Sequence, residues 1–255
     1  MSIIIAPSRM EPVRIEDPSS DLLRKADDIR ILVRRLSEEA AHPRIDELRH
    51  AMAVASAWHS SRLEKRICNP AAVFRSLSGA ADSSAVVREV AGLARLHIKI
   101  NHDADQGTLC DPSTIDWLKE MHADFCASSD VLCRLGRVGD LRDRDVVVGD
   151  HTPPPCDRVE AFLAHFCKRF RMDWLKGDAT QVLALASAHH RLSWIHPFED
   201  GNGRVLRLHG HAFAQRTGMA AGGLWSLPRA LALGVPGRSS YHEMMSVADR
   251  PRQGD

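Results

Sequence analysis

Hydrophobic residues recur at intervals of three and four along most of this chain, and charged residues fill the positions between them. This period is typical of amphipathic α-helices rather than of strands. It predicts helices over the ranges 20–41, 46–64, 84–98, 113–125, 157–170, 179–194, 203–217, 228–236 and 239–248. The predicted fold class is therefore mainly α.

One segment departs from the helical pattern. Residues 136–155 are rich in glycine and proline and surround the only strand-like run of the chain, Val146, Val147 and Val148. Such a run between turn-forming residues predicts a short β-hairpin flap.

A second interruption lies between two of the predicted helices. Residues 101–111 are polar and contain Gly107, which favours a loop. Ser113 with Asp116 three residues later resembles a capping box, so we expect the next helix to begin at Ser113.

The composition is that of a globular protein of one or two domains, with 255 residues, 44% hydrophobic and 26% charged. Aromatic residues make up only 5%, so we expect a core of Leu, Val, Ile and Ala. The 34 Lys and Arg residues nearly balance the 33 Asp and Glu residues. The formal net charge of +1 argues against a protein whose main partner is nucleic acid.

The sequence has no feature that points to a membrane or to export. No apolar run approaches the roughly 18 residues that a membrane span needs, and the N-terminus lacks the basic region of a signal peptide. The six cysteines contain no C-x-x-C pair, which favours reduced thiols over disulfides or a zinc site. We expect a cytoplasmic protein, and the sequence leaves a homo-oligomer open.

The residues with chemical potential gather in one stretch, His196 to Arg207, which reads HPFEDGNGRVLR. Pro197 cannot continue the preceding helix, so His196 lies where that helix ends. The Asp-Gly-Asn-Gly that follows predicts a tight turn that runs directly into a new helix. Such a turn or such a histidine alone is usually structural, and it is their occurrence together that indicates function.

The turn and the new helix predict an anion site. A glycine-rich turn at a helix N-terminus exposes backbone N–H groups and the positive end of the helix dipole. Arg204 and Arg207 lie on one face of the new helix, and two guanidiniums beside such a turn suit a polyphosphate. Asp200 offers the carboxylate oxygens that Mg²⁺ prefers, and His196 has the properties of a general base.

The stretch resembles the signature of the Fic-domain family, His-Pro-Phe-x-Asp/Glu-Gly-Asn-Gly-Arg-x-x-Arg, and matches it at every fixed position. The helix before it, ASAHHRL at 186–192, and the valine run followed by Pro153-Pro154 also resemble the family. The resemblance covers roughly residues 45–250. It implies a Fic-type helical fold, with packed N-terminal helices, that transfers AMP from ATP to a Ser, Thr or Tyr hydroxyl of a target protein.

The resemblance also implies a role for each matching residue. His196 would deprotonate the target hydroxyl, and Asp200 would coordinate Mg²⁺ as the cofactor. Arg204 would hold the β-phosphate and Arg207 the γ-phosphate of the ATP substrate. The residues implied to bind the nucleotide are Gly201, Asn202, Gly203, Arg204 and Arg207. The residues implied to dock the target are Val146, Val147 and Val148.

A second resemblance lies upstream, where SSRLEK at 60–65 is similar to the family's inhibitory motif Ser/Thr-x-x-x-Glu-Gly/Asn. It implies that Glu64 pairs with Arg207 and blocks productive ATP placement, and that Ser60 positions the inhibitory helix. The plain alternative is a solvated helix end. Lys65 departs from the motif, and because Lys enters the left-handed conformation less readily than Gly or Asn, we predict that the helix continues through Arg66.

Two alternative functions share these residues. A hydrolase that removes AMP would use the same site with Glu64 orienting water, and a non-enzymatic regulator would only bind nucleotide. The intact His196 and Asp200 argue against the second. The expected organisation is an irregular arm with three prolines, N-terminal helices that include the inhibitory helix, a Fic core and a polar tail, over 1–18, 19–110, 111–250 and 251–255 respectively.

Overall fold

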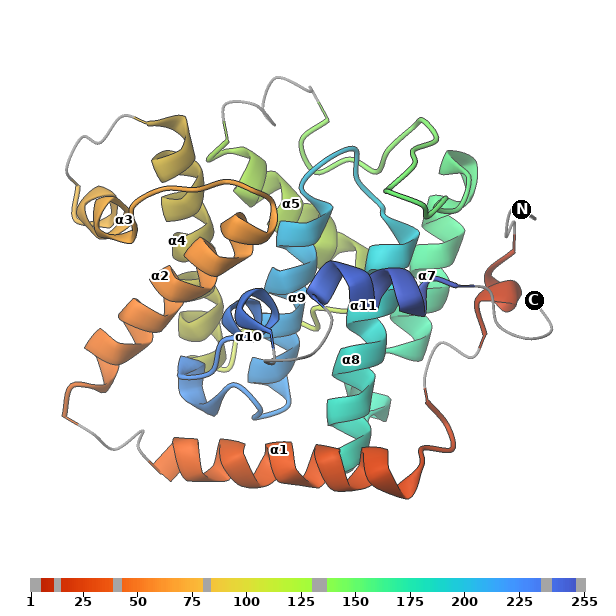
Figure 1. The fold of residues 1–255 in the computed structure, drawn as a ribbon, viewed down its shortest axis with the longest axis horizontal. Coiled ribbons are helices and arrows are strands. Elements are labelled where there is room, and N and C mark those ends of the chain that lie inside the picture. The colour runs from red at the N-terminus through yellow and green to blue at the C-terminus, as the bar shows by residue number, and fades with distance from the viewer. Residues whose placement is uncertain are drawn as a thin grey trace.

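The fold is seen in a computed structural model that describes residues 6–11, 15–38, 43–79, 84–129, 137–234 and 240–250. Over these residues the chain forms α-helices joined by loops and 3₁₀ turns (Figure 1). The α-helices are α1 (Ser20–Glu38), α2 (Ile45–Leu63), α3 (Pro70–Leu77), α4 (Ala85–Asp105), α5 (Ile115–Cys126), α7 (Val159–Arg169), α8 (Asp178–Ile195), α9 (Asn202–Arg216), α10 (Leu227–Leu233) and α11 (Tyr241–Ala248). The 3₁₀ turns are η1 (Pro7–Met10), η3 (Cys156–Arg158), η4 (Met172–Trp174) and η5 (Ala221–Gly223). The predicted mainly α fold is confirmed.

Helix α9 forms the centre of the fold. It is buried almost continuously from Arg204 to Ala214, and it packs against α2, α4, α5, α8 and α10 (Figure 1). Its N-terminus therefore opens inside a ring of helices rather than on the surface. None of the described helices is long and apolar enough to cross a membrane.

The core contains more aromatic side chains than we expected from a composition of 5% aromatic residues. Most of the phenylalanines are fully buried, namely Phe125, Phe162, Phe166, Phe170, Phe198 and Phe213. Their rings fill the space between α5, α7, α8 and α9, where each ring removes a large apolar area from water. The expected core of Leu, Val, Ile and Ala was thus only part of the answer.

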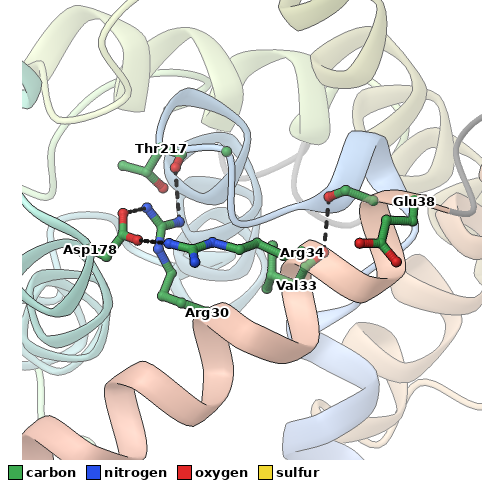
Figure 2. Close-up of a pocket in the computed structure, with 8 residues that line it drawn as sticks. Arg30, Val33, Arg34, Glu38, Asp178 and Thr217 are labelled. Carbon is green, nitrogen blue, oxygen red and sulfur yellow. Dashed lines mark hydrogen bonds and ion pairs between the residues drawn. The ribbon is translucent and has the colours of Figure 1, made fainter.

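Helix α1 lies across one end of the bundle, at the bottom of Figure 1, and two arginines attach it there. Arg30 donates to the backbone carbonyl of Thr217 at 3.1 Å and forms an ion pair with Asp178 at the start of α8. Arg34 also pairs with Asp178, at 2.7 Å (Figure 2). These residues line a cavity of about 430 Å³. Because Arg30 and Arg34 already have partners, the contacts are those of a structural attachment.

The end of α2 differs from the prediction. The helix stops at Leu63 and does not continue through Arg66, because Lys65 adopts φ +58°. The N–H of Lys65 donates to the carbonyl of Arg62 at 2.9 Å, and the N–H of Arg66 donates to that of Ser61 at 2.9 Å. This is the Schellman pattern, which normally uses glycine at the left-handed position. The prediction was wrong because two closing hydrogen bonds and the packing of the helix end outweigh about 1–2 kcal/mol of left-handed strain at a lysine.

Two helix boundaries differ from the expected ones, and one short helix was missed. Helix α4 runs on to Asp105, so the expected loop begins later, and Asn101 within it accepts from His211 and Gln215 of α9 instead. Thr114, not Ser113, caps α5 by accepting from the N–H of Trp117 at 3.3 Å. Helix α3 was not predicted, although Asn69 caps it and Pro70 is its first residue.

The expected β-hairpin flap reduces to a single bridge. Val148 and His151 exchange backbone hydrogen bonds of 2.9 and 3.0 Å around a turn, and no strand forms among the described residues of this segment. Val146 and Val147 have no regular secondary structure, and the side chains of Val147 and Val148 are 71% and 40% exposed. The valine run is therefore an irregular, largely solvent-facing segment rather than half of a hairpin.

Candidate functional site

The loop between α8 and α9 holds the residues that the sequence singled out. His196 ends α8 in the left-handed conformation, with φ 51° and ψ 63°. Gly201 precedes α9 with φ 80°, a conformation that glycine adopts without strain. The chain thus turns within a few residues from α8 into α9, and these two helices pack against each other. A residue in the left-handed conformation stands at each end of the loop.

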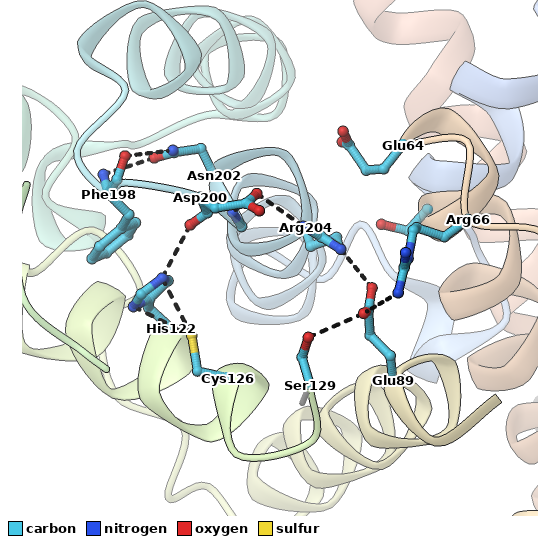
Figure 3. Close-up of polar contacts among 12 residues, drawn as sticks. Glu64, Arg66, Glu89, His122, Cys126, Ser129, Phe198, Asp200, Asn202 and Arg204 are labelled. Carbon is cyan, nitrogen blue, oxygen red and sulfur yellow. Dashed lines mark hydrogen bonds and ion pairs between the residues drawn. The ribbon is translucent and has the colours of Figure 1, made fainter. Parts of the chain in front are cut away.

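Side-chain contacts within the loop and with α5 fix the conformation of this loop. The Asn202 amide donates to the carbonyl of Phe198 at 2.8 Å and accepts from its N–H at 2.9 Å. The Phe198 ring stacks on the ring of His122 in α5, with centroids 4.0 Å apart (Figure 3). His122 accepts from the N–H of Gly139 at 3.0 Å, so its other nitrogen donates to the carbonyl of Asp200 at 3.1 Å. Burial lowers the pKa of His122, which favours this neutral form.

The N-terminus of α9 is occupied by the carboxylate of Glu64. Arg207, whose side chain is 1% exposed, donates from Nη2 to Glu64 Oε1 at 2.6 Å. It also donates from Nε to Ser60 Oγ at 2.7 Å and from Nη2 to the Ser60 carbonyl at 3.1 Å. A Cβ atom at Gly203 would collide with Glu64 Oε1, so the carboxylate lies directly on the first turn of the helix. Burial raises the pKa of Glu64, but Arg207 and Arg204 outweigh that effect and lower it overall.

Arg204 is held by a second acidic group, the buried Glu89 of α4. Arg204 Nη1 donates to Glu89 Oε1 at 2.5 Å, and its Nη2 donates to Asp200 Oδ1 at 3.1 Å (Figure 3). The other oxygen of Glu89 accepts from Arg66 at 3.1 Å and from Ser129 Oγ at 3.1 Å. Glu89 therefore links the helix end that carries Glu64 to the arginine at the start of α9.

The charges around the first turn of α9 balance. Three guanidiniums, those of Arg66, Arg204 and Arg207, face three carboxylates, those of Glu64, Glu89 and Asp200. Removal of the Glu64 carboxylate would leave a net positive site at a helix N-terminus. Such a site favours the binding of an anion.

His196 is neutral in this structure. Burial, aided by the nearby charge of Arg142, lowers its pKa to about 4, although a hydrogen bond to the Ser193 carbonyl acts in the opposite direction. One ring nitrogen is thus a donor to Ser193, and the other retains its lone pair. The side chain can accept a proton from a group that comes within hydrogen-bond distance of that nitrogen.

The last carbonyls of α8 are bound by residues of the 142–151 segment. Arg142 donates from Nε to the carbonyl of His196 at 2.8 Å, and His151 Nε2 contacts the carbonyl of Trp194 at 2.8 Å. The Arg142 N–H donates to the carbonyl of Pro197 at 2.9 Å. The valine run lies between these two anchoring residues in the sequence.

Helix α11 covers the site from the C-terminal side. Its Tyr241 hydroxyl is 2.9 Å from His189 Nε2 and lies close enough to Arg207 and Glu64 for both to affect its pKa, which burial raises. Figure 1 shows α11 crossing in front of α8, beside α9. Arg207 is thereby enclosed by α2, α8, α9 and α11.

The structure brings most of the predicted residues together. At the start of α9, Arg204 bonds to Asp200, and Arg207 bonds to Ser60 and Glu64. His196 lies at the other end of the same loop, close enough to Glu64 for that carboxylate to raise its pKa. The Asn202 side chain is used within the loop. The valine run Val146–Val148 lies outside this cluster and is joined to it through Arg142 and His151.

Four residues that contact the site were not predicted, namely Glu89, His122, Arg142 and Tyr241. Glu89 in the middle of a helix and Arg142 in a polar loop resemble ordinary surface residues in the sequence. Of these four residues, only Tyr241 stands out in the sequence, because it is the single tyrosine of the chain.

Comparison with known proteins gives a consistent result. Residues 112–214 match the model of the Fic/DOC family. The protein adenylyltransferase fic-1 of Caenorhabditis briggsae is 30% identical over 140 residues, which are 53% of this chain and 24% of that protein. The protein adenylyltransferase Fic of Drosophila willistoni is 41% identical over 85 residues, which are 31% of this chain and 16% of that protein. The chain therefore spans about a quarter or less of these curated relatives.

Solved structures show the same fold. A Fic family protein from Desulfovibrio desulfuricans superimposes with a TM-score of 0.66 at 20% identity, over 90% of this chain and 66% of that chain. Fic-1 from Caenorhabditis elegans superimposes with a TM-score of 0.61 at 22% identity, over 90% of this chain and 66% of that chain. Residues 112–214 of this chain therefore form a Fic domain of the Fic/DOC family, and the solved structures share its fold.

Proposed function

We propose that this chain is a protein adenylyltransferase that transfers AMP from ATP to a Ser, Thr or Tyr hydroxyl of a target protein, and that Glu64 holds it inactive. The observation that carries the proposal is the position of the Glu64 carboxylate. It is an anion bound to Arg207 on the first turn of α9, where a nucleotide phosphate would lie. The matching relatives named protein adenylyltransferases support the activity.

The first turn of α9 would bind the phosphates. The backbone of Gly201, Asn202 and Gly203 opens this helix, where the free N–H groups and the dipole favour anions. Arg204 would hold the β-phosphate from its present position beside Asp200. Arg207 would hold the γ-phosphate once Glu64 has left it.

The residues at the loop fit a bound Mg²⁺ ion. The Asp200 side chain is 51% exposed, and its carboxylate faces the start of α9. Among the described residues, no three His, Cys, Asp or Glu side chains gather as a metal cage, so the protein ligand would be Asp200 and the remaining donors would be phosphate and water oxygens. When bound, Mg²⁺ would neutralise phosphate charge.

His196 would act as the general base. Its free ring nitrogen takes the proton of the target hydroxyl while the hydroxyl oxygen attacks the α-phosphorus of ATP. The bond from the α-phosphorus to the oxygen of the β-phosphate breaks, and pyrophosphate leaves. Because a pKa of about 4 makes His196 a weak base, most of the acceleration must come from positioning and charge stabilisation.

Glu64 and the γ-phosphate would compete for one guanidinium. Arg207 is buried, and Ser60 already holds two of its donors, so it has little freedom to reach a second anion beside Glu64. ATP can therefore bind productively only when the end of α2 moves or when Glu64 is removed. We propose residues 19–110 as the regulatory part and 111–250 as the catalytic part of this mechanism.

The valine run would present the target. Val147 and Val148 are exposed and Val146 and Val147 have no regular secondary structure, so the run would be free to pair with an extended segment of a partner protein, as in strand addition. Pairing of this kind would fix the target hydroxyl relative to His196.

The proposal is tested with ATP labelled on the α- or the γ-phosphate, incubated with a cell lysate and the Glu64→Gly variant, with and without the added His196→Ala substitution. We expect protein-bound label from α-labelled ATP only, and none from the His196→Ala variant. Retained γ-label, or equal labelling by His196→Ala, would contradict the proposal. A pre-modified target that loses AMP with wild-type protein but not with Glu64→Gly would instead support the hydrolase.

A further inference from the structure

The C-terminus of α8 cannot close in the usual way. His196 is left-handed, and its N–H donates to the carbonyl of Leu192 at 3.2 Å. The next residue is Pro197, which has no N–H to donate to the last turn. The final carbonyls of this helix, which carry the negative end of its dipole, must therefore find donors elsewhere.

Arg142 supplies most of these donors. Its side chain is 0% exposed, and its Nε donates to the carbonyl of His196 at 2.8 Å. Its Nη2 lies 3.5 Å from the carbonyl of Ile195, and its backbone N–H donates to the carbonyl of Pro197 at 2.9 Å. Three successive carbonyls around the catalytic loop thus point at one residue.

The same guanidinium also holds its own segment. Nη1 donates to the carbonyl of Arg144 at 3.0 Å, and Nη2 donates to that of Pro154 at 2.5 Å. The nearest carboxylate, that of Asp145, is 3.9 Å away and mostly exposed. The five N–H donors of a guanidinium have a fixed geometry, so one buried arginine can hold several backbone carbonyls at once.

His151 makes a second connection of the same kind. Its Nε2 is 2.8 Å from the carbonyl of Trp194, one residue before the carbonyl that Arg142 reaches. His151 also pairs with Val148 through the backbone bridge. The run Val146–Val148 is therefore flanked by two residues, Arg142 and His151, that are both hydrogen-bonded to the end of α8.

We propose that Arg142 is a positioning residue of the active site, which fixes His196 through the carbonyls at the end of α8 and ties the target-docking run to the same point. This inference rests on the proposed function, since it assumes that His196 is the general base. Through Arg142, the distance between a docked target and the base is set by one rigid side chain. Arg142 bonds to the His196 carbonyl and to the carbonyls of Arg144 and Pro154, which lie on either side of the docking run.

The expected consequence is large because His196 is a weak base. A displacement of about 1 Å in a positioned group can lower a rate about a hundredfold. The charged and titratable groups that act on His196 are Arg142, His151 and Glu64, and Arg142 lowers its pKa. Loss of the Arg142 charge should therefore raise the pKa of His196 as well as disturb its position.

The test compares Arg142→Met, Arg142→Lys and the control Arg158→Met, all in the Glu64→Gly background. Arg158 is exposed at the start of α7 and makes only a loose ion pair. The measurements are kcat and KM for ATP, and the pKa of His196 from NMR titration, assigned with a His196→Gln sample. Circular dichroism shows whether each variant folds.

We expect Arg142→Met to lower kcat about ten- to a hundredfold with KM for ATP unchanged, and to raise the His196 pKa by at least about half a unit. Arg142→Lys keeps the charge but has fewer donors, so it should keep the low pKa and still lower kcat. A folded Arg142→Met with the kcat and pKa of the control would overturn the proposal. If Arg142→Met does not fold, an unchanged kcat in Arg142→Lys overturns it. The titration needs no ATP turnover, so it distinguishes failure of this inference from failure of the proposed function.

Discussion

Replacement of Glu64 by glycine should raise the rate of AMP transfer about ten- to thirtyfold. The ion pair with Arg207 is a single short hydrogen bond of 2.6 Å between charged groups. Such bonds contribute about 1.5–3 kcal/mol, and the 32% exposure of the Glu64 side chain places this one near the lower end. A difference of about 1.5–2 kcal/mol between inhibited and competent states corresponds to that range of rates.

The assay measures both ATP affinity by calorimetry and label transfer from α-labelled ATP. Glu64→Gln, which keeps the size and removes the charge, should give a smaller increase because the amide still fills the space over Gly203. Glu47→Gln is the matched control, since Glu47 is exposed in the first turn of the same helix and binds only Arg44. If Glu64→Gly binds ATP and transfers label no better than Glu47→Gln, Glu64 only ends a helix and does not inhibit AMP transfer.

The same geometry leads to four further predictions. His196→Ala should lower labelling at least about a hundredfold while calorimetry shows ATP binding nearly unchanged, and near wild-type labelling would make His196 structural. Asp200→Ala, tested in the Glu64→Gly background, should abolish stimulation by Mg²⁺, whereas full Mg²⁺-dependent turnover would remove Asp200 from the metal site. Lys65→Gly should stabilise the fold by about 1 kcal/mol in urea titration, because glycine accepts the left-handed conformation found at φ +58°, and a loss of stability would contradict that conformation. Burial lowers the pKa of His189 and His209 to about 3 and that of His211 to about 4, so these rings stay neutral when folded but gain protons when unfolded. The contribution of these histidines to the free energy of unfolding should therefore be fully present above about pH 6.5. Below that pH the free energy of unfolding should fall by about 1.4 kcal/mol per pH unit per histidine, and equal urea midpoints at pH 7 and pH 5 would refute this.

The helices and the central loop could be predicted from the sequence because their signals are local. The three- and four-residue period located most of the helices to within a few residues, and the stretch from His196 to Arg207 contains its turn, its helix start and its charges in consecutive positions. Phe198 and Asn202 act within this same stretch. A contiguous site of this kind needs no knowledge of the tertiary fold.

The supporting residues could not be predicted because their contacts span the chain. Glu89 meets Arg204 from 115 positions away, and Arg142 meets His196 from 54 positions away. In the sequence neither residue differs from a solvated charge, and only packing brings it to the site. Lys65 shows the opposite case, in which a correct local preference is outweighed by the closing hydrogen bonds of the helix end.

We propose that this site transfers AMP from ATP to a protein hydroxyl and that Glu64 prevents this transfer. The most direct measurement is mass spectrometry of proteins recovered after incubation of Glu64→Gly with ATP, Mg²⁺ and lysate. We expect peptides that carry AMP on a Ser, Thr or Tyr oxygen, few of them with wild-type protein and none with the double variant Glu64→Gly/His196→Ala. Absence of AMP-modified peptides from the Glu64→Gly sample, while calorimetry shows that the variant binds ATP, would contradict the proposal.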